Sequence, residues 1–267
     1  MLLVGITTTC VSVAAEVAPA GGAVPDRVSQ GALVVARTTP GGRVQVAGRD
    51  VRVAADGTFV FGVARDATGR VPVKITHAGG NVVWDSPEVA ARDWDLEIID
   101  GVPPDTVDPP KAVAERIARE AAAVAAARTR DDARTGFAQA FAWPVQGRIS
   151  GRFGSGRVYN GRPGAGHSGM DIAAPAGTPV LAPASGVVTL ADDLYITGGT
   201  VLLDHGHGVS SNFLHLSRID VAVGDTVEQG QPIGLVGATG RATGPHLHWG
   251  MNWFDVRVDP LLVLPAD

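Results

Sequence analysis

Short apolar segments separated by turn residues fill the first hundred positions of the chain. The apolar residues either alternate with polar ones or form short runs, and turn signals such as Pro40-Gly41-Gly42 and Asp56-Gly57 lie between them. The segments are residues 32–36, 44–46, 51–53, 59–61, 71–75 and 96–98. Several short strands at this spacing predict a small β-sandwich, which we place at residues 28–101 as an accessory domain.

A helical periodicity follows two proline pairs, Pro103-Pro104 and Pro109-Pro110. From Lys111 to about Arg130 the chain is rich in alanine and other good helix formers, and a proline just before a helix favours its start. The apolar residues Val113, Ile117, Ala121 and Val124 recur on one helical face. We therefore predict a Pro-rich linker and a spacer helix over residues 102–136, packed on one of the domains.

Glycine and proline become dense again beyond Phe141, which favours turns and short strands over helices. We predict a second, mostly antiparallel β-domain over residues 137–267. The fold class expected for the chain is thus all-β with one spacer helix.

Composition narrows the function classes. The net charge is −5 and aromatic residues make up 5% of the chain, and no run of basic residues occurs, so a nucleic-acid partner is not expected. The single cysteine, Cys10, excludes a disulfide framework and a cysteine-based zinc site. Any metal site must therefore use His, Asp or Glu.

The first fifteen residues are apolar and uncharged and end in Val13-Ala14-Ala15, which is typical of a cleavage site for an export signal. We predict such a signal at residues 1–15 and an exported protein without a membrane span, because the stretch is too short to cross a bilayer. No basic segment precedes it, so a frayed apolar terminus or a misplaced start codon are alternatives. Attachment of lipid at Cys10 is a third.

Six of the seven histidines lie between His167 and His248. In His167-Ser-Gly-Met-Asp171 a central glycine disfavours a helix, and in an extended chain residues at even spacing face the same side. The two histidines of His246-Leu-His248 would likewise share a side, and His215 lies on a short apolar segment. Two histidines and one aspartate with an open fourth position are typical of a catalytic zinc site. Spacing alone leaves open the alternative that these side chains are hydrogen-bonded core residues.

These motifs resemble the lysostaphin/LytM-type family of zinc metallopeptidases over residues 143–260. The resemblance rests on motifs in family order: Arg152-Phe-Gly154, His167-Ser-Gly-Met-Asp-Ile-Ala-Ala-Pro175, Asp204-His-Gly206, His215-Leu216, Gly237-Ala-Thr-Gly240 and Gly244-Pro-His-Leu-His248. It implies a groove with one Zn²⁺ held by His167, Asp171 and His248, and two catalytic histidines, His215 and His246. It also implies hydrolysis of peptidoglycan peptides in the cell envelope by a zinc-activated water.

The remaining polar residues of this region receive weaker expectations. His205 is expected to contact the metal ligands without binding the metal itself, or to face the substrate. His207 is expected to be a solvated loop residue. Asn160 either forms a simple Asn-Gly turn or borders the open metal position in a self-inhibited form. Phe213 stands where many family members have tyrosine, which removes a hydroxyl near the groove.

Two rival functions can be weighed on the sequence. Some segments resemble biotinyl or lipoyl carrier domains, but no lysine follows Lys111, so a carrier function fails. A non-enzymatic activator of other hydrolases is disfavoured because all five family residues are present. The architecture favours a D-alanyl–diaminopimelate link over a glycine bridge as substrate, and the pattern predicts no particular oligomeric state.

Overall fold

The computed structural model of the protein describes residues 24–265. The predicted export signal at residues 1–15 and Cys10 lie outside this range. In the described part of the chain, no helix combines the length and hydropathy that a bilayer-spanning helix needs.

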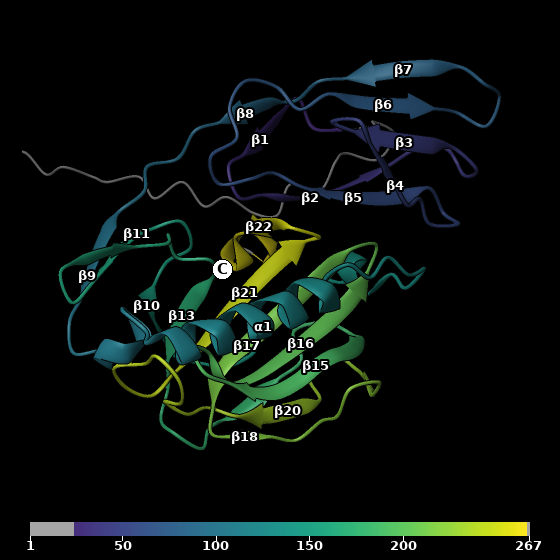
Figure 1. Cartoon of the computed structure of the whole chain (residues 1–267). Helices are drawn as coiled ribbons and strands as arrows, with labels where there is room; N and C mark the ends of the chain where they lie inside the picture. The colour runs from purple at the N-terminus through teal and green to yellow at the C-terminus, as the bar shows by residue number, and fades with distance from the viewer. Residues whose placement is uncertain (1–23, 266–267) are drawn as a thin grey trace, which may run out of the picture.

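The N-terminal strands form three small sheets (Figure 1). Strand β1 (Arg27–Ser29) pairs with β8 (Glu88–Ala90), and β2 (Leu33–Arg37) pairs with β5 (Thr58–Gly62). The third sheet has the order β4-β3-β6-β7, with bounds Arg49–Val51, Arg43–Val46, Val73–Thr76 and Val82–Asp85. The strands predicted near residues 32–75 are confirmed, whereas their packing as a sandwich stays a prediction.

Strand β9 (Leu96–Ile99) lies apart from the other N-terminal strands. It pairs in parallel with β11 (Gly156–Tyr159), which also pairs with β12 (Arg162–Gly164). The strand expected in the accessory domain therefore contributes to a sheet of the C-terminal part (Figure 1). Alternation within β9 could not show this, because the pattern does not specify which strand is the partner.

The helix α1 (Lys111–Ala127) begins directly after Pro110, as predicted, and ends three residues before Arg130. It lies along β15 (Gly186–Leu194) (Figure 1). Its residues Val124 and Ala127 pack against Leu190, Leu194 and Leu202. Short 3-10 helices flank it at Pro104–Thr106 and Gly136–Ala138.

An antiparallel sheet forms the centre of the C-terminal part, in the order β10-β13-β21-β17-β16-β15-β19, with β22 paired to β21. The bounds are Arg148–Gly151, Met170–Ala173, His246–Trp253, Val209–Leu216, Gly198–Gly206, Gly186–Leu194, Thr226–Val227 and Val256–Val258. A smaller sheet joins β14 (Pro179–Leu181), β20 (Pro232–Leu235) and β18 (Arg218–Ile219), and a last 3-10 helix spans Pro260–Val263. The predicted fold class is confirmed.

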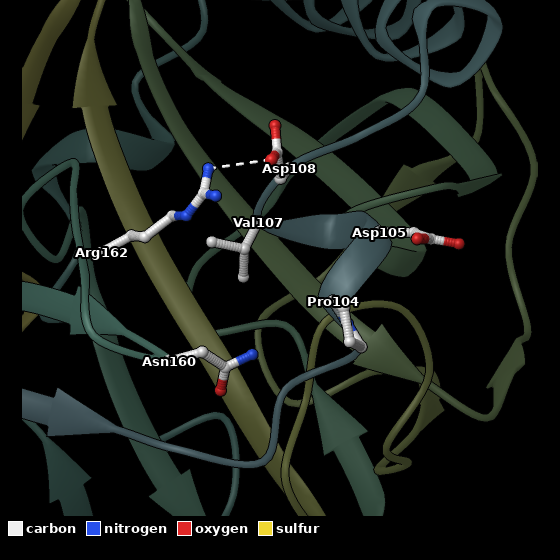
Figure 2. A pocket seen from close by; sticks show the side chains of 6 residues that line it. All are labelled: Pro104, Asp105, Val107, Asp108, Asn160 and Arg162. Atoms are coloured by element: carbon white, nitrogen blue, oxygen red, sulfur yellow. Dashed lines mark ion pairs between the residues drawn. The ribbon is translucent and has the colours of Figure 1, made fainter.

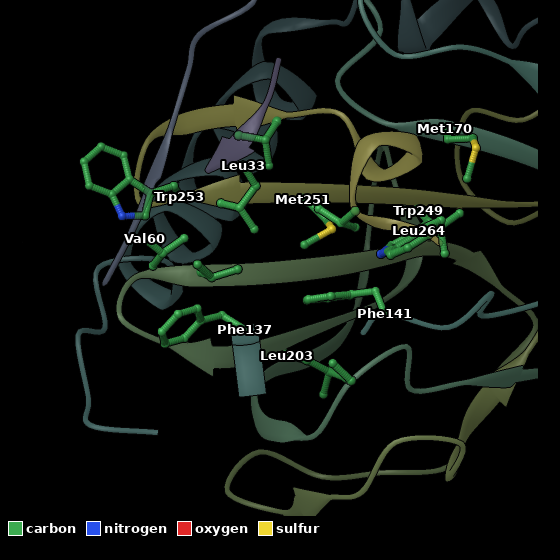
Figure 3. Packing of buried hydrophobic residues seen from close by; sticks show 14 of the residues in the cluster. Leu33, Val60, Phe137, Phe141, Met170, Leu203, Trp249, Met251, Trp253 and Leu264 are labelled. Carbon is green, nitrogen blue, oxygen red and sulfur yellow. The ribbon is translucent and has the colours of Figure 1, made fainter. Parts of the chain in front are cut away.

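One buried hydrophobic cluster runs through both parts of the chain. Figure 3 shows Leu33 and Val60 of the N-terminal strands near Met251 and Trp253 of β21. Gly62 makes this approach feasible, because a Cβ there would lie 2.9 Å from the Cβ of Trp253. The cluster buries the core-facing side of the strand that carries His248.

Candidate metal centre

Three predicted ligands come together at the junction of β13 and β21. His167 lies just before β13, Asp171 is the second residue of β13, and His248 is the third residue of β21. Asp171 and His248 face each other directly in the antiparallel register. Cross-strand partners project to the same side of a sheet, so the pairing itself aligns these two donors.

The donor atoms of the three residues face one point. Asp171 Oδ1 lies 3.0 Å from His167 Nε2 and 2.8 Å from His248 Nδ1, and the two nitrogens are 3.1 Å apart. All three residues are buried. Donors bound to one tetrahedral zinc at about 2.0–2.1 Å would be roughly 3.3 Å apart, so the spacing needs only a small expansion to hold an ion. The donor set therefore fits a divalent metal.

Neighbouring groups orient both imidazoles. His167 Nδ1 donates a hydrogen bond to the carbonyl oxygen of Arg152 at 2.8 Å, so the lone pair of Nε2 faces the cluster. His248 presents Nδ1, while its Nε2 lies against Gly169, where an added Cβ would stand only 2.7 Å away. The glycine of the His-x3-Asp motif is therefore needed for close approach rather than for a turn.

Charge keeps Asp171 ionised. Burial alone would raise the pKa of its carboxyl, but the adjacent imidazoles of His167 and His248 lower that pKa well below its usual value. Its second oxygen, Oδ2, accepts a hydrogen bond from Arg157 Nη2 at 2.6 Å. Arg157 could not be recognised from the sequence, because a lone arginine in a Gly-rich segment gives no signal of a buried ion pair.

The two histidines predicted as catalytic lie side by side next to the ligands. The ring centres of His215 and His246 are 4.8 Å apart, and His246 Nε2 lies 3.9 Å from Asp171 Oδ1. Each ring donates Nδ1–H to a backbone carbonyl, that of Thr239 at 2.7 Å and that of Gly244 at 2.8 Å. Both rings therefore leave Nε2 available as a proton acceptor when neutral.

His215 reaches this position through an unusual backbone. Leu214, not His215, is the residue opposite His248 in the register, so regular alternation would turn His215 to the other side of the sheet. Its φ of +65° changes the direction of the side chain. Burial, followed by the like charges of His246 and His248, lowers the pKa of His215 to about 3, so the ring is neutral at physiological pH.

The other two histidines of the region have different surroundings. His205 on β16 is fully buried and hydrogen-bonds to the carbonyl of Ser185 at 2.9 Å and to Ser211 Oγ at 2.8 Å, and none of the five site residues is a partner. Burial lowers its pKa to about 4. The prediction of a solvated His207 is wrong: its ring is buried and packs on Phe137 at 4.6 Å.

Asn160 occupies the turn between β11 and β12 with a φ of +47°. Its side chain accepts from Gly101 N at 3.0 Å and donates to the carbonyl of Val102 at 2.9 Å, so it holds the linker rather than a metal position. Figure 2 shows it on the wall of a cavity of about 310 Å³, opposite the ion pair of Arg162 and Asp108. The simple turn is therefore the better account of this residue.

Comparisons with known proteins agree with this geometry. The sequence model of peptidase family M23 matches residues 165–260, which include the five residues of the site. Peptidoglycan DD-endopeptidase ShyA of Vibrio cholerae is 47% identical over 83 residues, which cover 31% of this chain and 19% of that protein. DD-carboxypeptidase/endopeptidase Mpg of Neisseria meningitidis is 44% identical over 97 residues, 36% of this chain and 22% of that protein. The chain thus spans about a fifth of the length of these relatives.

A solved structure extends the similarity over most of the chain. A crystal structure of a Pseudomonas aeruginosa protein described as a peptidase M23 is 33% identical and superposes with a TM-score of 0.71. The match covers 90% of this chain and 96% of that one, so it extends well beyond the residues that the family model matches. On this similarity the chain belongs to peptidase family M23.

Proposed function

We propose that the protein is a zinc-dependent endopeptidase that hydrolyses peptide cross-links of bacterial peptidoglycan. The observation that carries this proposal is the convergence of His167, Asp171 and His248 on one point, with two further imidazoles beside it. Zinc bound by these three residues would supply a water of lowered pKa and a Lewis acid for the scissile carbonyl.

The two remaining histidines would handle protons and charge. His215 and His246 each carry a proton on Nδ1 and direct Nε2 away from that hydrogen bond, so either ring can take the proton of the attacking water. The protonated ring or its neighbour would then stabilise the oxyanion of the tetrahedral intermediate. His215 is neutral at physiological pH, the protonation state that a proton acceptor needs, while its pKa of about 3 makes it a weaker base than a free imidazole.

The substrate follows from the relatives and from the site together. ShyA is named as a peptidoglycan DD-endopeptidase and Mpg as a DD-carboxypeptidase/endopeptidase, and they are 47% and 44% identical to this chain over 83 and 97 residues. A D-alanyl–diaminopimelate cross-link is therefore the substrate that we propose, in preference to a glycine bridge. We therefore also propose that the protein acts outside the cytoplasm, in the cell envelope.

Digestion of purified sacculi tests this function. Zinc-loaded wild-type protein should release uncross-linked muropeptides, identified by mass spectrometry, and the chelated protein should release none. His246→Ala should lower turnover by about 100-fold or more, because a general acid–base group contributes about 10²–10⁴-fold. His77→Ala is the control, because the His77 side chain hydrogen-bonds only to Thr39 among the described residues. Equal turnover by wild type and His246→Ala would overturn the mechanism.

A further inference from the structure

Strand β9 brings an acidic residue to the metal centre from outside the family region. In the parallel pairing of β9 with β11, Glu97 is the register partner of Arg157. Both residues precede residues 165–260, which the family model matches. The contact between them therefore joins the segment before the linker to the ligand cluster.

Glu97 reaches two of the three ligands through one intermediate each. Its Oε2 accepts a hydrogen bond from Arg157 Nε at 2.9 Å, and Arg157 Nη2 donates to Asp171 Oδ2 at 2.6 Å. Its Oε1 accepts from the backbone N–H of Arg152 at 3.3 Å, and the carbonyl of Arg152 accepts from His167 Nδ1 at 2.8 Å. One carboxylate thus fixes the groups that orient Asp171 and His167.

Burial and packing leave this arrangement little freedom. The side chains of Arg157 and Asp171 are 11% and 10% exposed, and that of Glu97 is 24% exposed. A Cβ on Gly151 would lie 2.6 Å from Asp171 Oδ2 and 2.8 Å from Arg157 Nη2, so no side chain fits between the pair and the sheet. The guanidinium lies between two carboxylates, and a two-sided contact of this kind uses the planar donor geometry of arginine.

We propose that Arg157 and Glu97 are positioning residues of the metal centre. Arg157 occupies Oδ2 of Asp171, so that only Oδ1 is presented to an ion, and Glu97 holds Arg157 and the Arg152 carbonyl in place. Strand β9 is then a working part of the centre rather than of the accessory domain. The inference rests on the proposed function, because it assigns the two residues a part in metal binding.

Zinc affinity of the full chain tests the inference, measured by competition with a chromophoric chelator. Arg157→Lys keeps the charge but loses the planar fork, and it should weaken zinc binding about 10- to 100-fold, the effect typical of groups that orient metal ligands. Glu97→Gln should weaken binding several-fold, since the amide keeps the size and one acceptor. Matched controls are Arg162→Gln, in the next strand with an exposed partner, and Glu88→Gln on β8; both should bind as wild type does.

The outcomes separate the inference from the proposed function. If Arg157→Lys and Glu97→Gln bind zinc as tightly as the wild type does, the positioning role is overturned. The proposed function is unaffected by that result. Absence of zinc binding by the wild type would overturn the proposed function itself. Glu97→Gln is nearly isosteric at a partly exposed site, so it decides the question alone if Arg157→Lys does not fold. A lower zinc affinity in Glu97→Gln, with unchanged affinity in the two controls, supports the inference.

Discussion

Single atoms decide the chemistry of the metal centre. Oδ1 of Asp171 contacts the imidazoles of His167 and His248, and Oδ2 accepts a hydrogen bond from Arg157. His248 directs Nδ1 to the same point, and its Nε2 lies against Gly169. The resemblance to a zinc metallopeptidase family implied which residues share the site, whereas even spacing alone indicated only that His167 and Asp171, and His246 and His248, face the same side. The sequence could not predict which atom of each residue faces the candidate metal position, since that depends on backbone carbonyls and glycines contributed by other segments.

Gly169→Ala should damage the site without changing any ligand. The added Cβ would stand 2.5 Å from the carbonyl oxygen of Trp249 and 2.7 Å from His248 Nε2, so the ligand ring must move. We expect zinc affinity to fall by about tenfold or more and stability to fall by roughly 1–3 kcal/mol. Gly79→Ala is the control, because nothing lies within 4 Å of its Cβ position. Equal zinc affinities of wild type and Gly169→Ala in chelator competition would show that the site accommodates a Cβ at position 169.

His205 should make stability depend on pH. Its folded pKa is about 4 and its ordinary value 6.5, so the unfolded chain binds a proton that the folded chain excludes. The contribution of His205 to the free energy of unfolding is constant above about pH 6.5. It falls progressively as the pH drops toward 4, which destabilises the fold, and it is constant again below about pH 4. At about pH 5 the loss is about 2 kcal/mol relative to neutral pH.

The comparison of His205→Gln with wild type isolates this effect. Glutamine keeps a donor and an acceptor for Ser185 and Ser211 but does not titrate. Urea unfolding at neutral pH and near pH 5 should show a smaller acid loss in His205→Gln, while His77→Gln should lose as much as wild type. If His205→Gln and wild type lose the same free energy of unfolding between neutral pH and pH 5, the folded protein does not exclude a proton from His205.

Pairing partners, rather than the presence of strands, limited the prediction of elements. Alternation located most N-terminal strands, yet β9 has its partner sixty positions further along the chain. Likewise Gly206-His207-Gly208 has the composition of an exposed turn, but the segment after α1 covers it: Phe137 packs on the His207 ring and the Arg134 backbone abuts Gly206. Composition describes a segment alone, and tertiary contacts from distant residues override it.

A partly buried hydrogen bond attaches the spacer helix to the turn after β15. Glu120 Oε2 accepts from the backbone N–H of Tyr195 at 2.8 Å, and its other oxygen pairs with Arg116. Glu120→Ala should cost about 1–2 kcal/mol in urea unfolding and speed hydrogen exchange of the Tyr195 amide. Glu115→Ala, an exposed position of the same helix, should do neither. Unchanged exchange in Glu120→Ala would show that this hydrogen bond does not hold the helix in place.

At the scale of the whole molecule, an ion pair and a shared core join the N-terminal strands to the peptidase part. Arg92 Nη2 lies 2.8 Å from Asp259 Oδ2, and the Asp259 side chain is 3% exposed. Asp259 Oδ1 also accepts from Leu261 N at the start of the last 3-10 helix. The sequence predicted two domains but not this junction, because neither residue stands in a recognisable motif.

Arg92→Ala should destabilise the whole molecule. It leaves a buried carboxylate without its cation, which we expect to cost about 2–3 kcal/mol in the free energy of unfolding. Arg37→Ala breaks a surface ion pair, in which the side chains of Arg37 and Asp56 are 72% and 56% exposed. This change should lower the free energy of unfolding by at most about 1 kcal/mol. Equal losses in urea unfolding would show that the junction contributes no more than a surface contact.

The zinc content of the purified protein tests the central claim most directly. Metal analysis after dialysis should find about one zinc per chain in the wild type and in Asp255→Ala, whose side chain is 82% exposed on the wild-type surface. Asp171→Ala should retain almost none, because the aspartate supplies one of three donors and contacts the other two. Full zinc occupancy in Asp171→Ala, or no zinc in the wild type, would contradict the account.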